Sequence, residues 1–216
     1  MNVQPVETTL YSLSDAPPGA PDDRRDGDRL MTLYRVGSLV IAGSRELCLI
    51  KNISAGGMMV RTFCPIPEGT RLSVELKFGQ PITGVVSWAR DIHVGISFDE
   101  LIDVIDVLSP SAEGPRPRLP RIEVSSFITV REGASTYRMR ACDIGQGGLK
   151  VQCETALVPG TDVVVTLAGI DPQPAVVRWA HADHIGIVFN RLLPLPTLVD
   201  WLRDQRASMA PSAEGY

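Results

Sequence analysis

Two short segments near the start of the chain carry side chains suited to binding an anion. The first, residues 22–29, reads DDRRDGDR and places Arg25 and Arg29 four positions apart, with Arg24 beside them. The second, residues 52–57, reads NISAGG. A guanidinium group pairs bidentately with phosphate or with the O6/N7 edge of guanine, and its plane stacks on bases. Asn and Ser add short-range hydrogen bonds, and glycine permits close approach to the backbone. The two segments together therefore indicate an anion site.

The elements that must position these segments are short strands. Short runs rich in Val, Ile and Leu are separated by the turn-forming residues Gly, Pro, Asp and Ser. Within many of these runs, apolar and polar residues alternate. We expect strands at 31–42, 45–52, 56–62, 70–78, 82–90 and 92–98. The second segment then lies at a strand–turn–strand junction, and the first lies just before the first strand. Strands this short and numerous favour a barrel or a sandwich, because closure hides strand edges.

The chain contains this unit twice. When the sequence is shifted by 91 positions, NISAGG at 52–57 lies over DIGQGG at 143–148. Over 51–98 against 142–189, 17 of 48 ungapped positions are identical, where chance would give about 3. Two copies are too few for a solenoid, so we interpret each copy as a domain of its own.

The domain boundaries follow from composition and periodicity. A helix is expected after each last strand, at 99–108 and 195–206, where apolar residues recur at helical spacing. Four prolines within 109–120 indicate a stiff linker. The expected order is a disordered tail at 1–21, a first domain at 22–108, the linker at 109–120, a second domain at 121–206 and a flexible tail at 207–216.

Composition excludes several classes of protein. Hydrophobic residues make up 44% and charged residues 21%, as in a globular protein with a core. The formal net charge of −4 argues against a protein that wraps DNA or RNA. No apolar run approaches the roughly 18 residues of a membrane span, and the first residues do not form a secretory signal. We expect a cytoplasmic protein without membrane insertion.

Catalytic motifs are absent from the sequence. It offers no pairing of a nucleophile with a base, no phosphate-loop motif and no metal-ligand spacing, and its four cysteines have no CxxC spacing. We therefore expect no enzyme activity, no metal and no cofactor.

The two segments resemble the motifs of a known family. RDGDR fits RxxxR and NISAGG fits [D/N]xSxxG, in the order and strand context of a PilZ domain, the bacterial receptor module for the second messenger cyclic di-GMP (c-di-GMP). The resemblance covers roughly 22–108 and 116–206. It implies an all-β dominated fold of two tandem six-stranded β-barrels, each followed by a short α-helix, and a non-enzymatic c-di-GMP receptor or effector.

Carried onto this sequence, the resemblance implies a nucleotide site in the first copy. Its members would be Arg24, Arg25, Arg29, Asn52, Ser54, Gly56 and Gly57. Arg25 and Arg29 would hold the phosphates and guanine edges, and Arg24 would stack on or contact a guanine. Asn52 and Ser54 would form hydrogen bonds to the ligand from the barrel face. The glycines would keep the turn open to the nucleotide.

The second copy departs from the pattern. Asp143 and Gly148 match it, but Gly145 stands where serine is expected. If Arg121 is the second arginine of the upstream motif, Pro117 occupies the place of the first. We expect this copy to bind the nucleotide weakly or not at all and to contact a protein partner. The sequence leaves the oligomeric state open.

Several alternatives stay open. The arginines of 22–29 lie among aspartates and would also suit a solvated segment of mixed charge. The polar residues of 52–57 would also suit an ordinary turn. Trp88 and Trp179 recur in register, which favours core or barrel-rim packing. The alternative function is a PilZ-like protein-interaction module that binds no nucleotide.

Overall fold

The computed structural model describes residues 31–76, 81–108, 119–153 and 157–209. The expected N-terminal tail, most of the expected linker and the last seven residues lie outside this part. No helix in the described residues is long and apolar enough to cross a membrane.

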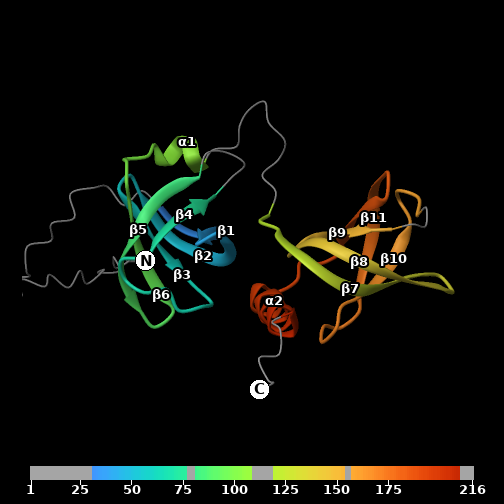
Figure 1. The fold of residues 1–216 in the computed structure, drawn as a ribbon. Coiled ribbons are helices and arrows are strands. Elements are labelled where there is room, and N and C mark those ends of the chain that lie inside the picture. The colour runs from blue at the N-terminus through green and yellow to red at the C-terminus, as the bar shows by residue number, and fades with distance from the viewer. Residues whose placement is uncertain (1–30, 77–80, 109–118, 154–156, 210–216) are drawn as a thin grey trace, which may run out of the picture.

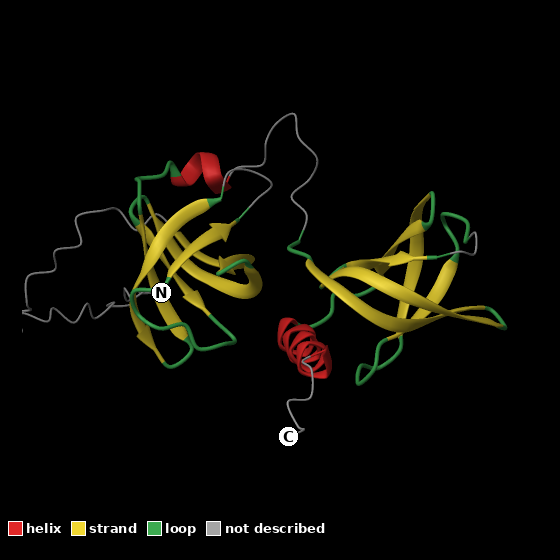
Figure 2. Cartoon of the chain, in the orientation of Figure 1, coloured by secondary structure: helices red, strands yellow, loops and turns green. Residues whose placement is uncertain are grey.

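Two closed barrels of six antiparallel strands make up most of the fold, which confirms what the resemblance to PilZ domains implies (Figure 1, Figure 2). Barrel 1 consists of β1 (Met31–Ile41), β2 (Ser44–Ser54), β3 (Gly57–Arg61), β4 (Arg71–Glu75), β5 (Ile82–Arg90) and β6 (His93–Phe98). Its strands pair in the order β1-β2-β3-β6-β5-β4, and β4 pairs with β1 to close the barrel.

Barrel 2 repeats this arrangement. It consists of β7 (Ile122–Glu132), β8 (Ser135–Gly145), β9 (Gly148–Gln152), β10 (Asp162–Thr166), β11 (Gln173–His181) and β12 (His184–Phe189). The strand order is the same, with β10 pairing with β7 at the closure. Each strand begins and ends 91 residues beyond its counterpart in barrel 1, which confirms the duplication.

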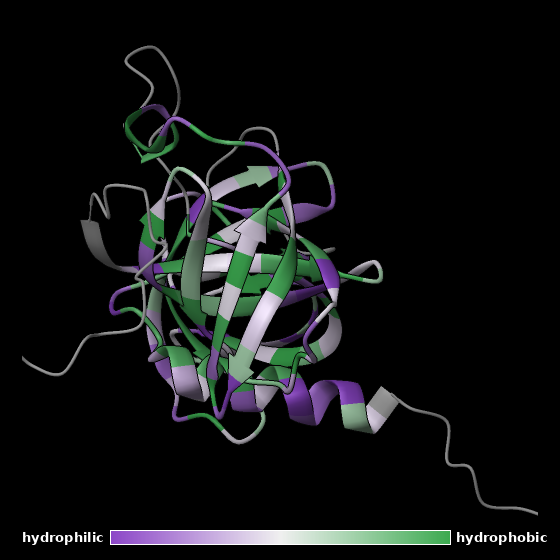
Figure 3. Ribbon diagram, turned by 90° about the vertical axis from the view of Figure 1, so that its left-hand side faces the viewer, coloured by the Kyte–Doolittle hydropathy of each residue, from purple (hydrophilic) through white to green (hydrophobic). Residues whose placement is uncertain are grey.

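Alternation along the strands separates the two surfaces of each barrel. In β3, Met58 and Val60 are buried while their neighbours are partly exposed, and β9 shows the same alternation at Leu149 and Val151. Figure 3 shows this as hydrophobic residues that alternate with more polar ones along the strands. The inward side chains form one apolar core per barrel, so the outward side chains remain available for binding.

The first helix is shorter than predicted. The sequence predicts a helix over 99–108, but α1 covers only Val104–Leu108. The carboxylate of Asp103 accepts hydrogen bonds from the backbone N–H groups of Ile105 (2.9 Å) and Asp106 (3.0 Å). Asp103 is therefore the N-cap, and the helix cannot begin before it.

The second helix, α2 (Leu195–Met209), lies between the two barrels (Figure 1). Leu198 and Trp201 pack into the core of barrel 2, and Gln205 accepts a hydrogen bond from Ser126 of β7. On the other side, Arg206 contacts Glu46 and donates to the Arg45 carbonyl (2.9 Å).

The outer face of barrel 1 beside α2 is apolar. Leu47 is buried in the same cluster as the core of barrel 2, and Val36, Leu49 and Phe63 pack against that cluster. Arg203 of α2 donates to the Phe63 carbonyl at 3.1 Å. The apolar contact and the arginine hydrogen bonds together couple the β1–β2 hairpin of barrel 1 to α2.

Candidate functional site

The NISAGG segment forms the β2–β3 hairpin of barrel 1. Ser54 and Gly57 pair across the hairpin and leave Ala55 and Gly56 as its two-residue turn. The Ser54 hydroxyl donates to the Gly57 carbonyl at 3.1 Å. The Asn52 side-chain oxygen accepts the backbone N–H of Met59 at 3.2 Å. Both polar side chains are therefore held in place, and both are only partly buried.

These internal hydrogen bonds determine what each side chain can offer a ligand. The Asn52 oxygen already accepts one backbone N–H, which fixes the amide so that its nitrogen can donate to a ligand. The Ser54 hydroxyl uses its proton within the turn, so its lone pairs are left to accept. Neighbouring donor and acceptor groups match a purine edge that carries both acceptors and donors, as guanine does.

An outward row of residues extends from Asn52 across the barrel. Asn52 pairs with Met59, Met59 with Gly95, and Gly95 with Trp88. Gly95 faces outward because its neighbours Val94 and Ile96 are in the core. A Cβ at this position would overlap the Trp88 indole, so that ring covers Gly95 on the outside.

The position of Trp88 makes it a candidate that the sequence interpretation missed. Packing was predicted for it, and it does pack on Gly95, but on the face that carries Asn52. The Arg90 guanidinium lies 5.9 Å from its ring centroid. The repeated spacing of Trp88 to Gly95 and of Trp179 to Gly186 was the available signal, because only glycine leaves room for an indole across a strand pair.

The two glycines of the turn differ in their surroundings. A Cβ at Gly57 would lie 2.5 Å from the Ile96 carbonyl oxygen of β6, so packing between strands requires glycine there. A Cβ at Gly56 would meet only a Leu101 methyl group, at 3.7 Å. Glycine at 56 is thus free of a packing requirement, and its exposed backbone is open to a ligand.

Arg24, Arg25 and Arg29 lie outside the described residues. The chain enters barrel 1 beside the turn, since Thr32 at the start of β1 pairs with Asn52. An extended chain spans at most about 3.6 Å per residue, so Arg29 is within about 11 Å of Thr32. By the same measure Arg25 is within about 25 Å of Thr32, so a site shared with the NISAGG turn is compatible with chain connectivity.

On the equivalent outer face of barrel 2, the charged side chains pair with one another. Arg121 pairs with Asp143 at 2.6 Å, and the Lys150 ammonium lies 3.9 Å from the second oxygen of that carboxylate. A Cβ at Gly145 would lie 2.6 Å from the Pro120 carbonyl oxygen. The segment entering barrel 2 thus lies directly on the turn, which gives a steric reason for glycine in place of serine.

A cavity of about 780 Å³ adjoins this face. Barrel 2 contributes Lys150 and Trp179, and barrel 1 contributes Arg45 and Glu75, which pair at 2.7 Å. Positive and negative side chains from both barrels line the cavity. Several of these charges are neutralised by ion pairs within the protein, such as Arg45–Glu75 and Arg121–Asp143.

Restoring the family's serine in barrel 2 is expected to damage the fold locally rather than create a second site. In Gly145→Ser the new side chain collides with the Pro120 carbonyl and displaces the segment that carries Arg121. We expect a lower midpoint of thermal unfolding, by a few degrees, and no added nucleotide in a calorimetric titration. Gly147→Ser is the matched control, because a Cβ there meets only leucine methyl groups at 3.5 and 3.7 Å. A Gly145→Ser protein that binds one more nucleotide than the parent would contradict this account.

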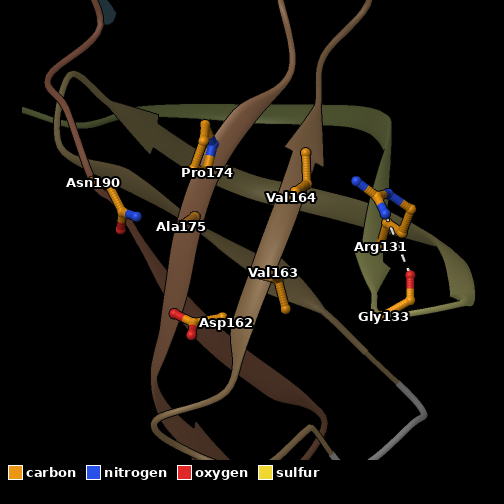
Figure 4. A pocket seen from close by; sticks show the side chains of 8 residues that line it. All are labelled: Arg131, Gly133, Asp162, Val163, Val164, Pro174, Ala175 and Asn190. Atoms are coloured by element: carbon orange, nitrogen blue, oxygen red, sulfur yellow. Dashed lines mark hydrogen bonds between the residues drawn. The ribbon is translucent and has the colours of Figure 1, made fainter.

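A second hollow, of about 340 Å³, lies on barrel 2 beside Arg131, Asp162 and Asn190 (Figure 4). The Arg131 guanidinium donates to the Gly133 carbonyl at 3.3 Å. No residue of the NISAGG or DIGQGG segments lines this hollow. It is therefore separate from the candidate site.

The strongest pKa shifts in the described residues lie away from the motif turns. Burial raises the pKa of the Cys48 thiol to about 12. Hydrogen bonds, first from its own backbone and then from Gln152, lower the pKa of Asp183. The His184 Nδ1 atom lies 2.7 Å from an Asp183 carboxylate oxygen. In the described part of the chain, no three His, Cys, Asp or Glu side chains are grouped to hold a metal ion.

Comparison with known proteins gives one family. The model of the PilZ domain matches residues 23–107 and again residues 115–202. No curated protein matches the chain.

Solved structures resemble the chain only distantly. Borreliella burgdorferi PlzA in complex with c-di-GMP has 13% sequence identity and a TM-score of 0.36, over 79% of this chain and 88% of PlzA. Bacillus subtilis MotI/DgrA, an inhibitor of motility, has 12% identity and a TM-score of 0.33, over 83% of this chain and 100% of MotI. Escherichia coli YcgR in complex with c-di-GMP has 14% identity and a TM-score of 0.29, over 81% of this chain and 83% of YcgR. These TM-scores are low, so the family evidence is the match of the PilZ model to both halves of the chain.

Proposed function

The chain belongs to the PilZ domain family, and from this premise we propose that it is a non-enzymatic, cytoplasmic receptor for c-di-GMP whose nucleotide site lies on the outer face of barrel 1. The supporting observation is the arrangement of Asn52 and Ser54. Internal hydrogen bonds leave one a donor and the other an acceptor on the same hairpin, next to the entry of an arginine-rich segment.

The ligand chemistry follows from these groups. Asn52 and Ser54 contact a guanine edge, and the Arg25 and Arg29 guanidinium groups pair with the phosphates. Arg24 stacks on or contacts a guanine. The nucleotide lies against the exposed backbone of Gly56 and the backbone of Gly57, which packs closely on β6. The Trp88 ring adds an aromatic surface on the same face.

We propose that binding is relayed through domain rearrangement or partner binding. The nucleotide would order the segment before β1 on barrel 1. That strand also forms the hairpin that contacts α2, so a change in barrel 1 reaches barrel 2 through this helix. Barrel 2, with its motif face closed by the Arg121–Asp143 pair, serves as the partner-binding domain.

A calorimetric titration of the full chain with c-di-GMP tests the site. We expect binding by the parent and at least tenfold weaker binding by Asn52→Ala/Ser54→Ala, because two polar contacts of about 1 kcal/mol each are lost. GTP serves as the control ligand. The control in barrel 2 is Lys150→Ala, beside the counterpart of Asn52, which should bind like the parent. Binding that is insensitive to the barrel 1 variant would exclude the proposed site, and no binding at all would favour the interaction module without nucleotide.

A further inference from the structure

The first hairpin of each barrel, β1–β2 or β7–β8, has one face that points away from the barrel core. In barrel 1, α2 packs on that face. Val36 pairs with Leu49, and Ser38 with Leu47, on the outside of the β1–β2 hairpin. Leu47 and Ser38 are only 5% and 2% exposed, although they point away from the barrel 1 core. Leu47 belongs to the cluster formed with α2.

The equivalent face of barrel 2 has a different composition and is uncovered. Shifted by 91 residues, Val36 becomes Phe127, Leu47 becomes Arg138 and Leu49 becomes Arg140. Phe127 is 62% exposed, which is unusual for so large an apolar side chain. We call the surface formed by Phe127, Arg131, Arg138 and Arg140 the basic-aromatic face.

The arginines of this face have neutral partners. Arg138 lies over the Phe127 ring at 4.3 Å, and Arg140 contacts the Ser125 hydroxyl at 2.6 Å. Arg131 donates to a backbone carbonyl. Within the described ranges no ion pair joins any of the three to a carboxylate. The face thus presents uncompensated positive charge around an exposed aromatic ring.

A complementary surface follows the last strand of barrel 1. Exposed side chains there alternate between acidic and large apolar types. We call the set Glu100, Leu101, Asp103, Ile105 and Asp106 the acidic segment. Leu101 is 82% and Ile105 is 70% exposed, although leucine and isoleucine are normally covered. No described residue of the chain covers them.

We propose that the basic-aromatic face of one chain binds the acidic segment of a second copy. Within one chain, the helix after barrel 2 docks on the first hairpin of barrel 1. In the proposed contact, the segment after barrel 1 of one chain packs on the first hairpin of barrel 2 of the other chain. The same kind of packing is thus used within a chain and between two chains. Phe127 then packs on Leu101 and Ile105, while the arginines face carboxylates.

A two-fold dimer satisfies both surfaces of each chain. Each basic-aromatic face receives the partner's acidic segment, and the assembly closes without leaving either surface free. Leu101 lies beside the turn at Gly56 but belongs to none of the proposed nucleotide-binding residues, so the contact is tested in the absence of c-di-GMP.

Sedimentation equilibrium and light scattering of the full chain test the proposal. We expect a reversible dimer at concentrations up to about 100 µM, the range that covers a small interface of micromolar affinity. High salt should weaken it, because exposed charges are screened. A protein that remains monomeric throughout this range would overturn the proposal.

Charge reversal locates the contact. Arg138→Glu/Arg140→Glu and, separately, Glu100→Arg/Asp106→Arg should each weaken the dimer at least tenfold. Asp103 is left unchanged because it caps α1. An equimolar mixture of the two variants should regain the dimer, since both contacts then join opposite charges. Arg191→Glu, an exposed arginine elsewhere on barrel 2, is the control and should dimerise like the parent. Dimers that tolerate both reversals, or a mixture that stays monomeric although each variant has the parent's thermal midpoint, would refute the contact.

Discussion

Replacing Arg25 and Arg29 together by alanine should lower the affinity of the chain for c-di-GMP by about two to four orders of magnitude. A hydrogen bond to a charged group contributes about 1.5–3 kcal/mol, and the double variant removes at least two of them. A loss of about 3–6 kcal/mol corresponds to the stated range of affinity. Both residues precede β1 in the sequence, so we expect the thermal midpoint to stay unchanged. Isothermal calorimetry gives the affinity and the number of bound nucleotides together.

The matched control for this variant lies ahead of barrel 2. Arg116→Ala/Arg118→Ala removes two arginines from the corresponding segment of the second copy. We expect parental affinity and stoichiometry, because the face of barrel 2 is closed by the Arg121–Asp143 pair. The assignment of the arginines would be wrong if the barrel 1 variant bound normally while this control lost affinity.

Replacing Gly57 by alanine should destabilise barrel 1 and remove nucleotide binding at the same time. The added Cβ would approach the Ile96 carbonyl oxygen to 2.5 Å, which forces β3 away from β6. Overpacking of this kind costs about 1–3 kcal/mol, and the thermal midpoint should fall on the order of 5–15 °C. The shift also moves the hairpin that holds Asn52 and Ser54. Differential scanning calorimetry and a c-di-GMP titration measure the two effects.

The neighbouring glycine provides the control. Gly56→Ala places its Cβ at 3.7 Å from a Leu101 methyl group, an ordinary contact, so the fold should keep its stability. Equal thermal midpoints for the Gly57 and Gly56 variants would show that the close approach of β3 to β6 does not constrain position 57.

The sequence predicted the strands and their duplication well because that information is local and repeated, whereas the choice of barrel over sandwich came from the resemblance to PilZ domains. Alternation fixes which side of a strand is buried, and the shift of 91 positions reports the same fold twice. The predicted helix at 99–108 was too long because periodicity alone does not reveal where a chain is capped. Asp103 caps α1 with two hydrogen bonds, and that role depends on its backbone conformation.

The contacts that the sequence did not predict depend on strand register and on tertiary packing. The register of β5 and β6 shifts between Val86 and Trp88, so strict alternation does not place that ring on the outer face. Gly145 stands where the family pattern has serine, and the Pro120 carbonyl that lies over it leaves no room for a side chain. The contact of Arg206 with the carbonyl of Arg45 spans 161 positions. These contacts are set by strand register, by a segment that packs on a turn and by packing between domains, which no local pattern encodes.

Hydrogen–deuterium exchange of the full chain with and without c-di-GMP tests the central claim most directly, because it reports on both barrels in one sample. The account predicts slower exchange in residues 52–59 of barrel 1 and in the segment before β1, with residues 143–150 of barrel 2 unchanged. Slower exchange in residues 143–150 with no change in 52–59 would place the nucleotide on barrel 2 and contradict the account.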